Sequence, residues 1–271
     1  MTVAGPGVRF RRPRNLAVRL RGVVPKLGFI LALLLLWQVL EVAGRLGGVP
    51  SPVEVGRALV DEIVRGAVWA PVGTTLVAWA VSFVLASVIG LVVGFALGAS
   101  RLAYQMSVFT LDFCRTIPTL ALVPLAILMY GAGLLGTVVL AVFGSVWAVL
   151  LQAIYGVRDV DPVARDTFRS YHATRFEVVT RLVLPTAAPY VATGLRLAAA
   201  ISLLLTLSAE IVMPAPGIGE QIVISQLGDA VPRMYAYIVL SGLLGVALNA
   251  VFVAAERRAL RWHPSHREEL H

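Results

Sequence analysis

Side chains that carry metal or nucleophilic chemistry are scarce in this chain of 271 residues. The single cysteine, Cys114, excludes a disulfide within the chain and a cysteine-based metal cluster. None of the four histidines lies near a carboxylate at metal-ligand spacing, and no GxSxG, HExxH or glycine-rich phosphate-binding motif is present. We therefore expect no catalytic residue, no metal, no cofactor and no means of using ATP in this chain. An intramembrane enzyme would lack a candidate nucleophile.

Charged residues are also few, at 14% against 58% hydrophobic residues, and the mean hydropathy is +0.84. Such a composition is typical of a polytopic membrane protein. A bilayer-crossing helix needs roughly twenty apolar residues. Six stretches qualify, at about 27–43, 74–99, 104–129, 134–155, 187–212 and 234–254. We predict an all-α integral membrane fold with six transmembrane helices in one domain, 27–262, between a basic segment 1–26 and a tail 263–271.

Basic residues outnumber acidic ones by 23 to 15, and their placement orients the chain. Seventeen of the 23 fall at the two termini, at Arg101 or in the loop 157–185, against four at the opposite ends of the spans. The positive-inside rule therefore places both termini and this loop in the cytoplasm. The net charge of +8 reflects topology and contact with membrane lipid. A nucleic-acid surface is not expected, because the basic N-terminus lacks interleaved aromatic residues.

Small residues recur at every fourth position in two of the predicted spans. Such ridges let neighbouring helices approach closely in a membrane. The ridges are Ser82, Ala86, Gly90, Gly94 and Gly98 in the second span, and Gly194, Ala198, Ser202 and Thr206 in the fifth. We therefore predict that Gly90, Gly94, Gly98 and Gly194 are helix-packing residues.

Arg115 lies near the cytoplasmic end of the third predicted span, close to Pro118, and Pro124 follows six residues later. A proline inside a span removes a backbone hydrogen bond and bends the helix. A charge at membrane depth is costly and is a functional hypothesis by default. Arg115, Pro118 and Pro124 are therefore candidates for the translocation pathway. In the alternative, Arg115 reaches the lipid headgroups or bonds to carbonyls at the bend.

Glu210 lies near the outer end of the fifth predicted span, and a segment rich in proline and glycine, 213–219, follows it. Irregular backbone at this depth is tolerated only where it is buried in protein or lines water. Two interpretations of Glu210 stay open. It is either a gate or anchor for this segment, or an interface residue exposed to outside water.

The loop 157–185 is polar within a chain that is otherwise nearly all apolar. Asp161 before Pro162 is typical of a helix start. Thr174 with Glu177 is a capping box, which predicts a second helix from there to Pro185. We expect this helix-turn-helix to dock on a soluble partner. The predicted docking residues are Asp166, Thr167, Phe168, Arg169, Ser170, Tyr171, His172, Ala173, Thr174, Arg175 and Phe176.

Several short motifs share the pattern of one family. They are Arg-Thr-Ile-Pro at 115–118, Val-Pro-Leu at 123–125, Gly-Ala-Gly at 131–133, Ala-Glu at 209–210 and Gly-Ile-Gly at 217–219. From about residue 50 to 262 the chain resembles the permease subunits of bacterial ATP-binding-cassette (ABC) importers of the nitrate, sulfonate and taurine type. The resemblance implies a MetI-like, type I importer architecture.

In that family a cytoplasmic loop carries the motif E-A-A-x-x-x-G and closes on a leucine-proline pair. In this chain Asp166, Thr167 and Phe168 stand at the first three positions, His172 stands at the glycine, and residues 184–185 are Leu-Pro. The resemblance implies that this loop is a coupling helix that fits a groove in a separate ATPase. Since the glycine ends a helix with positive φ, we expect positive φ at His172, a residue type that tolerates it.

The resemblance further implies a complex in the bacterial inner membrane. Its other members would be a dimer of ABC ATPase subunits that binds ATP and Mg²⁺, a second permease, and an external solute-binding protein or lipoprotein. The second permease would be another copy of this chain or a paralogue. The competing hypothesis is an ion-coupled secondary transporter that uses Arg115 and Glu210 as a relay. It leaves the helical loop unexplained, and no internal inverted repeat is visible.

Overall fold

The computed structural model describes residues 16–45 and 47–260. The predicted tail 263–271 and residues 1–15 of the basic segment lie outside the described residues. The described chain divides into two compact units, one up to Gly56 and one from Arg57 onward. The first contains α1 (Leu16–Val42) and the start of α2 (Pro52–Val64), where Ser51 and Glu54 form a reciprocal capping box.

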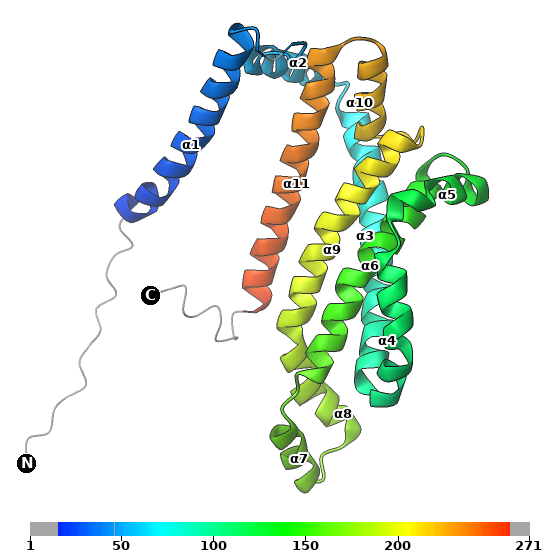
Figure 1. The fold of residues 1–271 in the computed structure, drawn as a ribbon. Helices are drawn as coiled ribbons and strands as arrows, with labels where there is room; N and C mark the ends of the chain where they lie inside the picture. Colours follow the sequence, from blue (N-terminus) through cyan, green and yellow to red (C-terminus); the bar gives the residue numbers. More distant parts are fainter. Residues whose placement is uncertain (1–15, 46, 261–271) are drawn as a thin grey trace, which may run out of the picture. The chain divides into compact units, whose positions relative to one another are not determined.

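Every regular element of the second unit, among the described residues, is helical, and the order follows the chain (Figure 1). After α2 come α3 (Trp69–Ala99), α4 (Arg101–Thr116), the 3₁₀ turn η1 (Thr119–Leu122), α5 (Val123–Tyr130) and α6 (Leu134–Arg158). The polar loop contains α7 (Pro162–Ser170) and α8 (Arg175–Val178), followed by the π-helical turn η2 (Val179–Val183). The chain then continues through α9 (Leu184–Val212), α10 (Ile218–Leu227) and α11 (Val231–Ala259).

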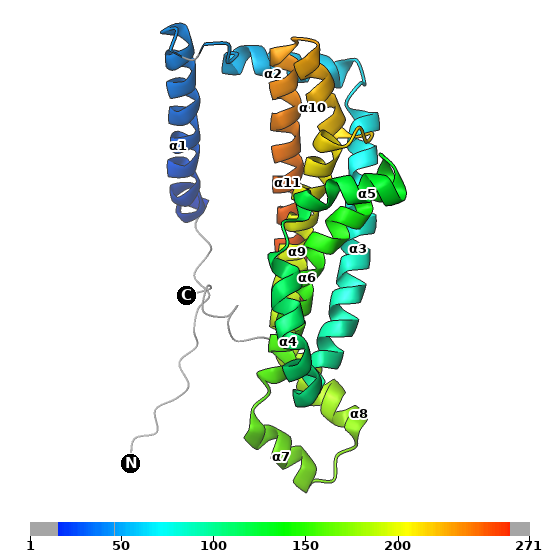
Figure 2. The ribbon, with the colours of Figure 1, turned by 45° about the vertical axis from the view of Figure 1, so that its right-hand side comes forward.

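The centre of this unit is a three-helix core in which α6 packs along both α3 and α9 (Figure 2). Glycines set the separation of these helices. A Cβ atom at Gly94 of α3 would lie 2.7 Å from both the Ala153 Cβ and the Leu150 carbonyl oxygen of α6. A Cβ atom at Gly194 of α9 would lie 2.9 Å from the Gln152 Cβ. Gly90 and Gly98 meet α6 in the same way, so larger residues at these positions would push the helices apart.

Four described helical stretches are long and apolar enough to cross a membrane: α3, α6, the stretch Arg175–Val212 and α11. A fifth span exists if α4 and the segment Thr119–Tyr130 count as one. The apolar part of α1, Gly28–Val42, is shorter than these stretches. The all-α membrane fold is confirmed, whereas the predicted number of six spans is not.

The third predicted span, 104–129, is not a continuous helix. Its two halves meet at an angle of 80°, and the break falls at Ile117 and Pro118, which both have extended backbone. Proline forces the preceding residue out of the helical region and supplies no N–H, so the helix ends there. Pro124 does not bend a helix, because it lies in the first turn of α5. Backbone N–H groups in a first turn have no acceptor within the helix, so the missing N–H of proline breaks no hydrogen bond there.

The helix predicted to end at Pro185 instead runs on into the membrane as one helical stretch, Arg175–Val212. Pro185 cannot donate a hydrogen bond to the preceding turn, and the π-helical turn η2 directly before it is the local adjustment that accommodates a proline. The second loop helix and the fifth span are therefore a single element.

Candidate functional site

The loop at one end of the second unit is built by local capping interactions. Asp161 accepts a hydrogen bond from the Val163 N–H at 2.8 Å and so caps the start of α7, as its sequence predicts. Thr174 and Glu177 form the predicted capping box: the Thr174 hydroxyl accepts from the Glu177 N–H, and the Glu177 carboxylate accepts from the Thr174 N–H. Both loop helices therefore begin where the sequence places them.

His172 ends α7 with a φ of +54°. The His172 N–H donates to the Arg169 carbonyl at 2.9 Å, and the Ala173 N–H donates to the Phe168 carbonyl at 3.0 Å. These are the two bonds of a Schellman cap, in which one residue takes the left-handed conformation. The positive φ predicted at His172 is confirmed.

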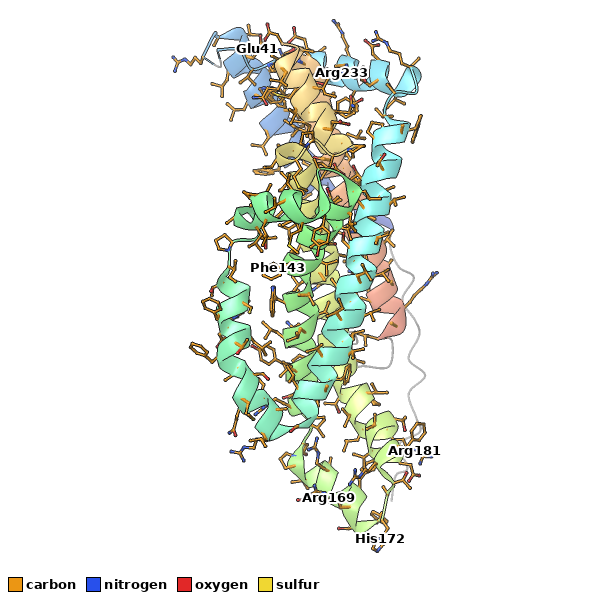
Figure 3. The ribbon with its side chains drawn as sticks, turned by 90° about the vertical axis from the view of Figure 1, so that its right-hand side faces the viewer. Glu41, Phe143, Arg169, His172, Arg181 and Arg233 are labelled. Atoms are coloured by element: carbon orange, nitrogen blue, oxygen red, sulfur yellow. The ribbon has the colours of Figure 1, made fainter. Side chains whose placement is uncertain are left out.

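An open hollow of about 320 Å³ lies beside this turn. Its lining is Thr167, Phe168, Tyr171, His172, Ala173, Glu177 and Arg181. The side chains of Tyr171 and Phe176 are 82% and 75% exposed, whereas Phe168 is only partly exposed. Two ion pairs flank the hollow, Asp166 with Arg169 at 3.3 Å and Glu177 with Arg181 at 3.9 Å. The loop thus presents exposed aromatic rings beside charges of both signs. Figure 3 shows Arg169, His172 and Arg181 at this end of the unit.

Glu210 is deeply buried, with 1% of its surface exposed. Its carboxylate accepts hydrogen bonds from the Thr75 hydroxyl at 3.0 Å and from the Gly219 N–H at 2.9 Å. The Thr75 hydroxyl in turn accepts from the Ile218 N–H at 2.9 Å. A single carboxylate on α9 thereby ties α3 to the first turn of α10. Of the two interpretations of Glu210, the structure shows the buried anchor.

Gly217 makes this anchor possible. A Cβ atom at that position would collide with the Glu210 carboxylate, so no larger residue fits between the carboxylate and the start of α10.

The sequence did not identify Thr75 as the second partner of Glu210. Its neighbour Thr74 donates to the Ala70 carbonyl of its own helix, which is the common role of a threonine inside a span. Composition alone does not distinguish the two residues.

Arg115 lies in the last turn of α4 and pairs with Asp112 of the same helix at 3.0 Å. Both side chains are about half exposed, at 47% and 54%. No contact among the described residues joins Arg115 to Glu210, the two members of the hypothetical ion relay. No group of three potential metal ligands occurs in the described part of the chain.

A second polar cluster lies at the end of the unit opposite the loop (Figure 3). Glu62 of α2 accepts a hydrogen bond from the Tyr237 hydroxyl at 2.9 Å and pairs with Arg233 at 3.3 Å. Arg233 also donates to Gln221 of α10 at 3.2 Å. This cluster joins α2, α10 and α11. No motif marks this cluster, because Glu62 is 175 positions away from its partner Tyr237 in the sequence.

The family of the chain follows from comparison with known proteins. The model that describes the inner membrane component of binding-protein-dependent transport systems matches residues 86–261, which include the loop, Glu210 and α10. The chain belongs to this family. It is a permease subunit of an ABC importer of the nitrate and sulfonate type, and the resemblance noted in its sequence is confirmed.

Curated relatives match along most of their length. The permease SsuC of Bacillus subtilis (strain 168), named for the transport of aliphatic sulfonates, is 25% identical over 85% of this chain and 84% of its own. The bicarbonate transport system permease CmpB of Synechococcus elongatus is 28% identical over 90% of this chain and 91% of its own. The nitrate import permease NrtB of Leptolyngbya laminosa is 24% identical over 87% and 88%.

The permease also shares its fold with a solved importer. An inward-facing structure of the MetNI methionine ABC transporter superposes with a TM-score of 0.60 and 20% identity, over 68% of this chain and 92% of that chain. The type I importer architecture is thereby confirmed. The permease is a multi-pass protein of the inner membrane, and subunits of this family are not themselves enzymes. Nothing in these comparisons supports an ion-coupled secondary transporter.

Proposed function

We propose that this permease forms the translocation pathway of an importer driven by a separate ATPase, and that the loop formed by α7 and α8 is where the ATPase binds. The observation that carries the proposal is the pair of exposed rings, Tyr171 and Phe176, beside the hollow at the His172 turn. Exposed apolar clusters of this kind mark interfaces, and a few buried aromatic residues tend to supply most of the binding energy. The ion pairs beside them would set orientation more than affinity.

Both termini of the permease and the loop would lie in the cytoplasm, where the loop can reach the ATPase. The two ATPase subunits would bind ATP and Mg²⁺, and ATP binding would close their dimer. Closure would move the two coupling loops of a permease pair, either two copies of this chain or this chain with a paralogue. The pathway between the permeases would then switch from inward-facing to outward-facing, as in alternating access. An external binding protein or lipoprotein would supply the solute. Arg115, Pro118 and Pro124 remain pathway candidates, whereas Glu210 would hold α10 in place.

The decisive experiment is copurification of the ATPase with loop variants of the full permease. Phe168→Asp and Tyr171→Asp should each abolish ATPase recovery and ATP-dependent uptake in proteoliposomes, because a carboxylate would then be buried in an apolar contact. Tyr171→Asp is the sharper variant, since its side chain is 82% exposed and its replacement costs the isolated permease little. Val163→Asp adds the same charge to an exposed position of α7 that does not line the hollow, and should retain binding.

Undiminished ATPase recovery by both loop variants, with uptake intact, would remove these aromatic residues from the interface. Loss of recovery in Val163→Asp as well would mean that any added charge on α7 disrupts docking, and the rings would have no special role.

We further propose that the solute is a small oxyanion. The relatives are named for sulfonates, bicarbonate and nitrate, which are all small anions with several oxygen acceptors. Uptake assays of the complete complex with each of these three anions test the proposal. Transport of a neutral solute, with no transport of any of the anions, would contradict it.

A further inference from the structure

A second hollow, of about 300 Å³, lies at the base of the loop rather than at its turn. Three arginines line it, Arg101 at the start of α4, Arg158 at the end of α6 and Arg165 on α7. The turn between α3 and α4 and the start of α7 lie at the same end of the unit (Figures 1 and 2). Three helices, α4, α6 and α7, thus each contribute one arginine to the wall of the same small space.

None of these three arginines has a carboxylate within ion-pair distance among the described residues. The nearby carboxylates are engaged elsewhere. Asp159 accepts from the Tyr190 hydroxyl at 2.9 Å, Asp161 accepts from the Val163 N–H, and neither lines the hollow. Asp166, next to Arg165, pairs with Arg169. The hollow therefore carries positive charge that the described part of the chain does not balance.

Arg158 is held in place by an aromatic contact. Its guanidinium carbon lies 4.0 Å from the centre of the Tyr104 ring. This cation–π contact fixes the position of the guanidinium group, and a π face takes up none of its N–H donors as a conventional hydrogen bond would. A planar group of this kind, fixed on a ring, is suited to bind two oxygens of one phosphate.

The position of the hollow indicates the source of an anion. Its walls include Gly98 and Ala99, where the membrane-crossing helix α3 ends, and Val157, where α6 ends. The ends of spanning helices lie at the level of the lipid headgroups. The hollow shares no lining residue with the one at the His172 turn, although Arg165 and Thr167 lie only two positions apart on α7.

We propose that the hollow lined by Arg101, Arg158 and Arg165 binds a phosphate group, carried by an anionic phospholipid headgroup or by free phosphate. A bound phosphate would connect the α3–α4 turn, the end of α6 and the start of α7. This site would hold the base of the loop in place from the membrane side. It goes beyond the proposed ATPase contact and does not depend on the identity of the transported solute.

The test uses the full permease in detergent and measures phosphatidylglycerol binding by native mass spectrometry. The double variant Arg101→Gln/Arg165→Gln should weaken binding about tenfold or more, because each arginine near a lipid phosphate contributes a factor of roughly five. Arg257→Gln/Arg258→Gln is the matched control, since it removes two exposed arginines from the last turn of α11. The control should weaken binding less than the double variant does, because Arg257 and Arg258 do not line the hollow.

A second variant leaves every charge in place. Ala99→Trp fills the hollow from its exposed wall and should weaken phosphatidylglycerol binding as much as the double charge variant does. Monodisperse elution and an unchanged thermal unfolding temperature show that each variant is folded. Inorganic phosphate is the second probe. If it raises the unfolding temperature of the unmodified permease but not of Arg101→Gln/Arg165→Gln, while the lipid does not bind, free phosphate is the ligand.

Three outcomes would overturn the proposal. Equal binding of both probes by the unmodified permease and by Arg101→Gln/Arg165→Gln would show that the hollow holds no phosphate. Equal losses in the control pair would assign the effect to general surface charge. Lost ATPase copurification with unchanged lipid binding would assign these arginines to the ATPase interface instead.

Discussion

His172 shows how one residue determines where the first loop helix ends. It takes a left-handed conformation that glycine adopts without steric cost, and the family's motif has glycine at this position. We expect His172→Gly to leave ATPase copurification unchanged. The variant should be as stable as the unmodified permease or more stable, with a change in the free energy of unfolding of less than about 1 kcal/mol. Thermal unfolding of the purified permease measures the change.

His172→Ala is the comparison, because alanine keeps the strain and loses the imidazole. It should be less stable than His172→Gly by about 1 kcal/mol. If glycine proves as damaging as alanine, the imidazole itself makes a contact that the loop requires.

Glu210 is the residue on which the position of α10 depends. Glu210→Ala would leave the Thr75 hydroxyl and the Gly219 N–H buried without an acceptor, at a cost of about 1–3 kcal/mol for each. Glu210→Gln retains a carbonyl oxygen at nearly the same place and should lose much less. Unfolding temperatures and yields of the two variants give the comparison. Equal losses in both would mean that the negative charge, rather than the acceptor, is required.

At the scale of helices, the contact between α3 and α6 depends on the absence of side chains. Gly94→Leu would force a bulky group against the Leu150 backbone and the Ala153 side chain, and overpacking of this kind costs about 1–3 kcal/mol. We expect a lower unfolding temperature and impaired assembly with the ATPase. Val92→Leu, at a position of α3 that is 65% exposed, should behave like the unmodified permease. Normal assembly and stability of Gly94→Leu would show that this helix pair can separate without loss.

The starts of the two loop helices were predictable because their signals are local. Asp161, Thr174 and Glu177 each act on a backbone group within three residues, so a short sequence window contains the whole interaction. The course of the chain between helix ends was harder to predict. Pro118 breaks a span and Pro185 does not, because the π-helical turn before Pro185 accommodates it.

The contacts of the two buried carboxylates, Glu210 and Glu62, could not be derived from the sequence. The Thr75–Glu210 bond joins positions 135 residues apart, and the Tyr237–Glu62 bond joins positions 175 apart. Glu210 was recognisable as a buried charge in an apolar span. Its partners depend on which helices are neighbours, and spacing along the chain does not contain that information.

For the whole molecule, the distribution of basic residues predicts that both termini are cytoplasmic. In a Cys114→Ser background, a cysteine at Ser265 should resist a membrane-impermeant thiol reagent added from outside, whereas a cysteine at the exposed position Asp61 should react. Ser265 lies outside the described residues, so this labelling tests the sequence prediction alone. Reaction at Ser265 with protection at Asp61 would reverse the orientation.

The continuous helix from Arg175 to Val212 has a mechanical consequence. Its 38 residues measure about 57 Å, with the exposed Phe176 near one end and the buried Glu210 near the other. Gly194 lies at its midpoint and is one of the close contacts between α9 and α6, so a tilt of the whole helix would be centred there. A rigid rod that tilts about its centre moves its two ends by equal amounts in opposite directions. A push on the loop would therefore reach the start of α10 as a displacement of similar size and reversed direction, reduced only by the compliance of the π-helical turn.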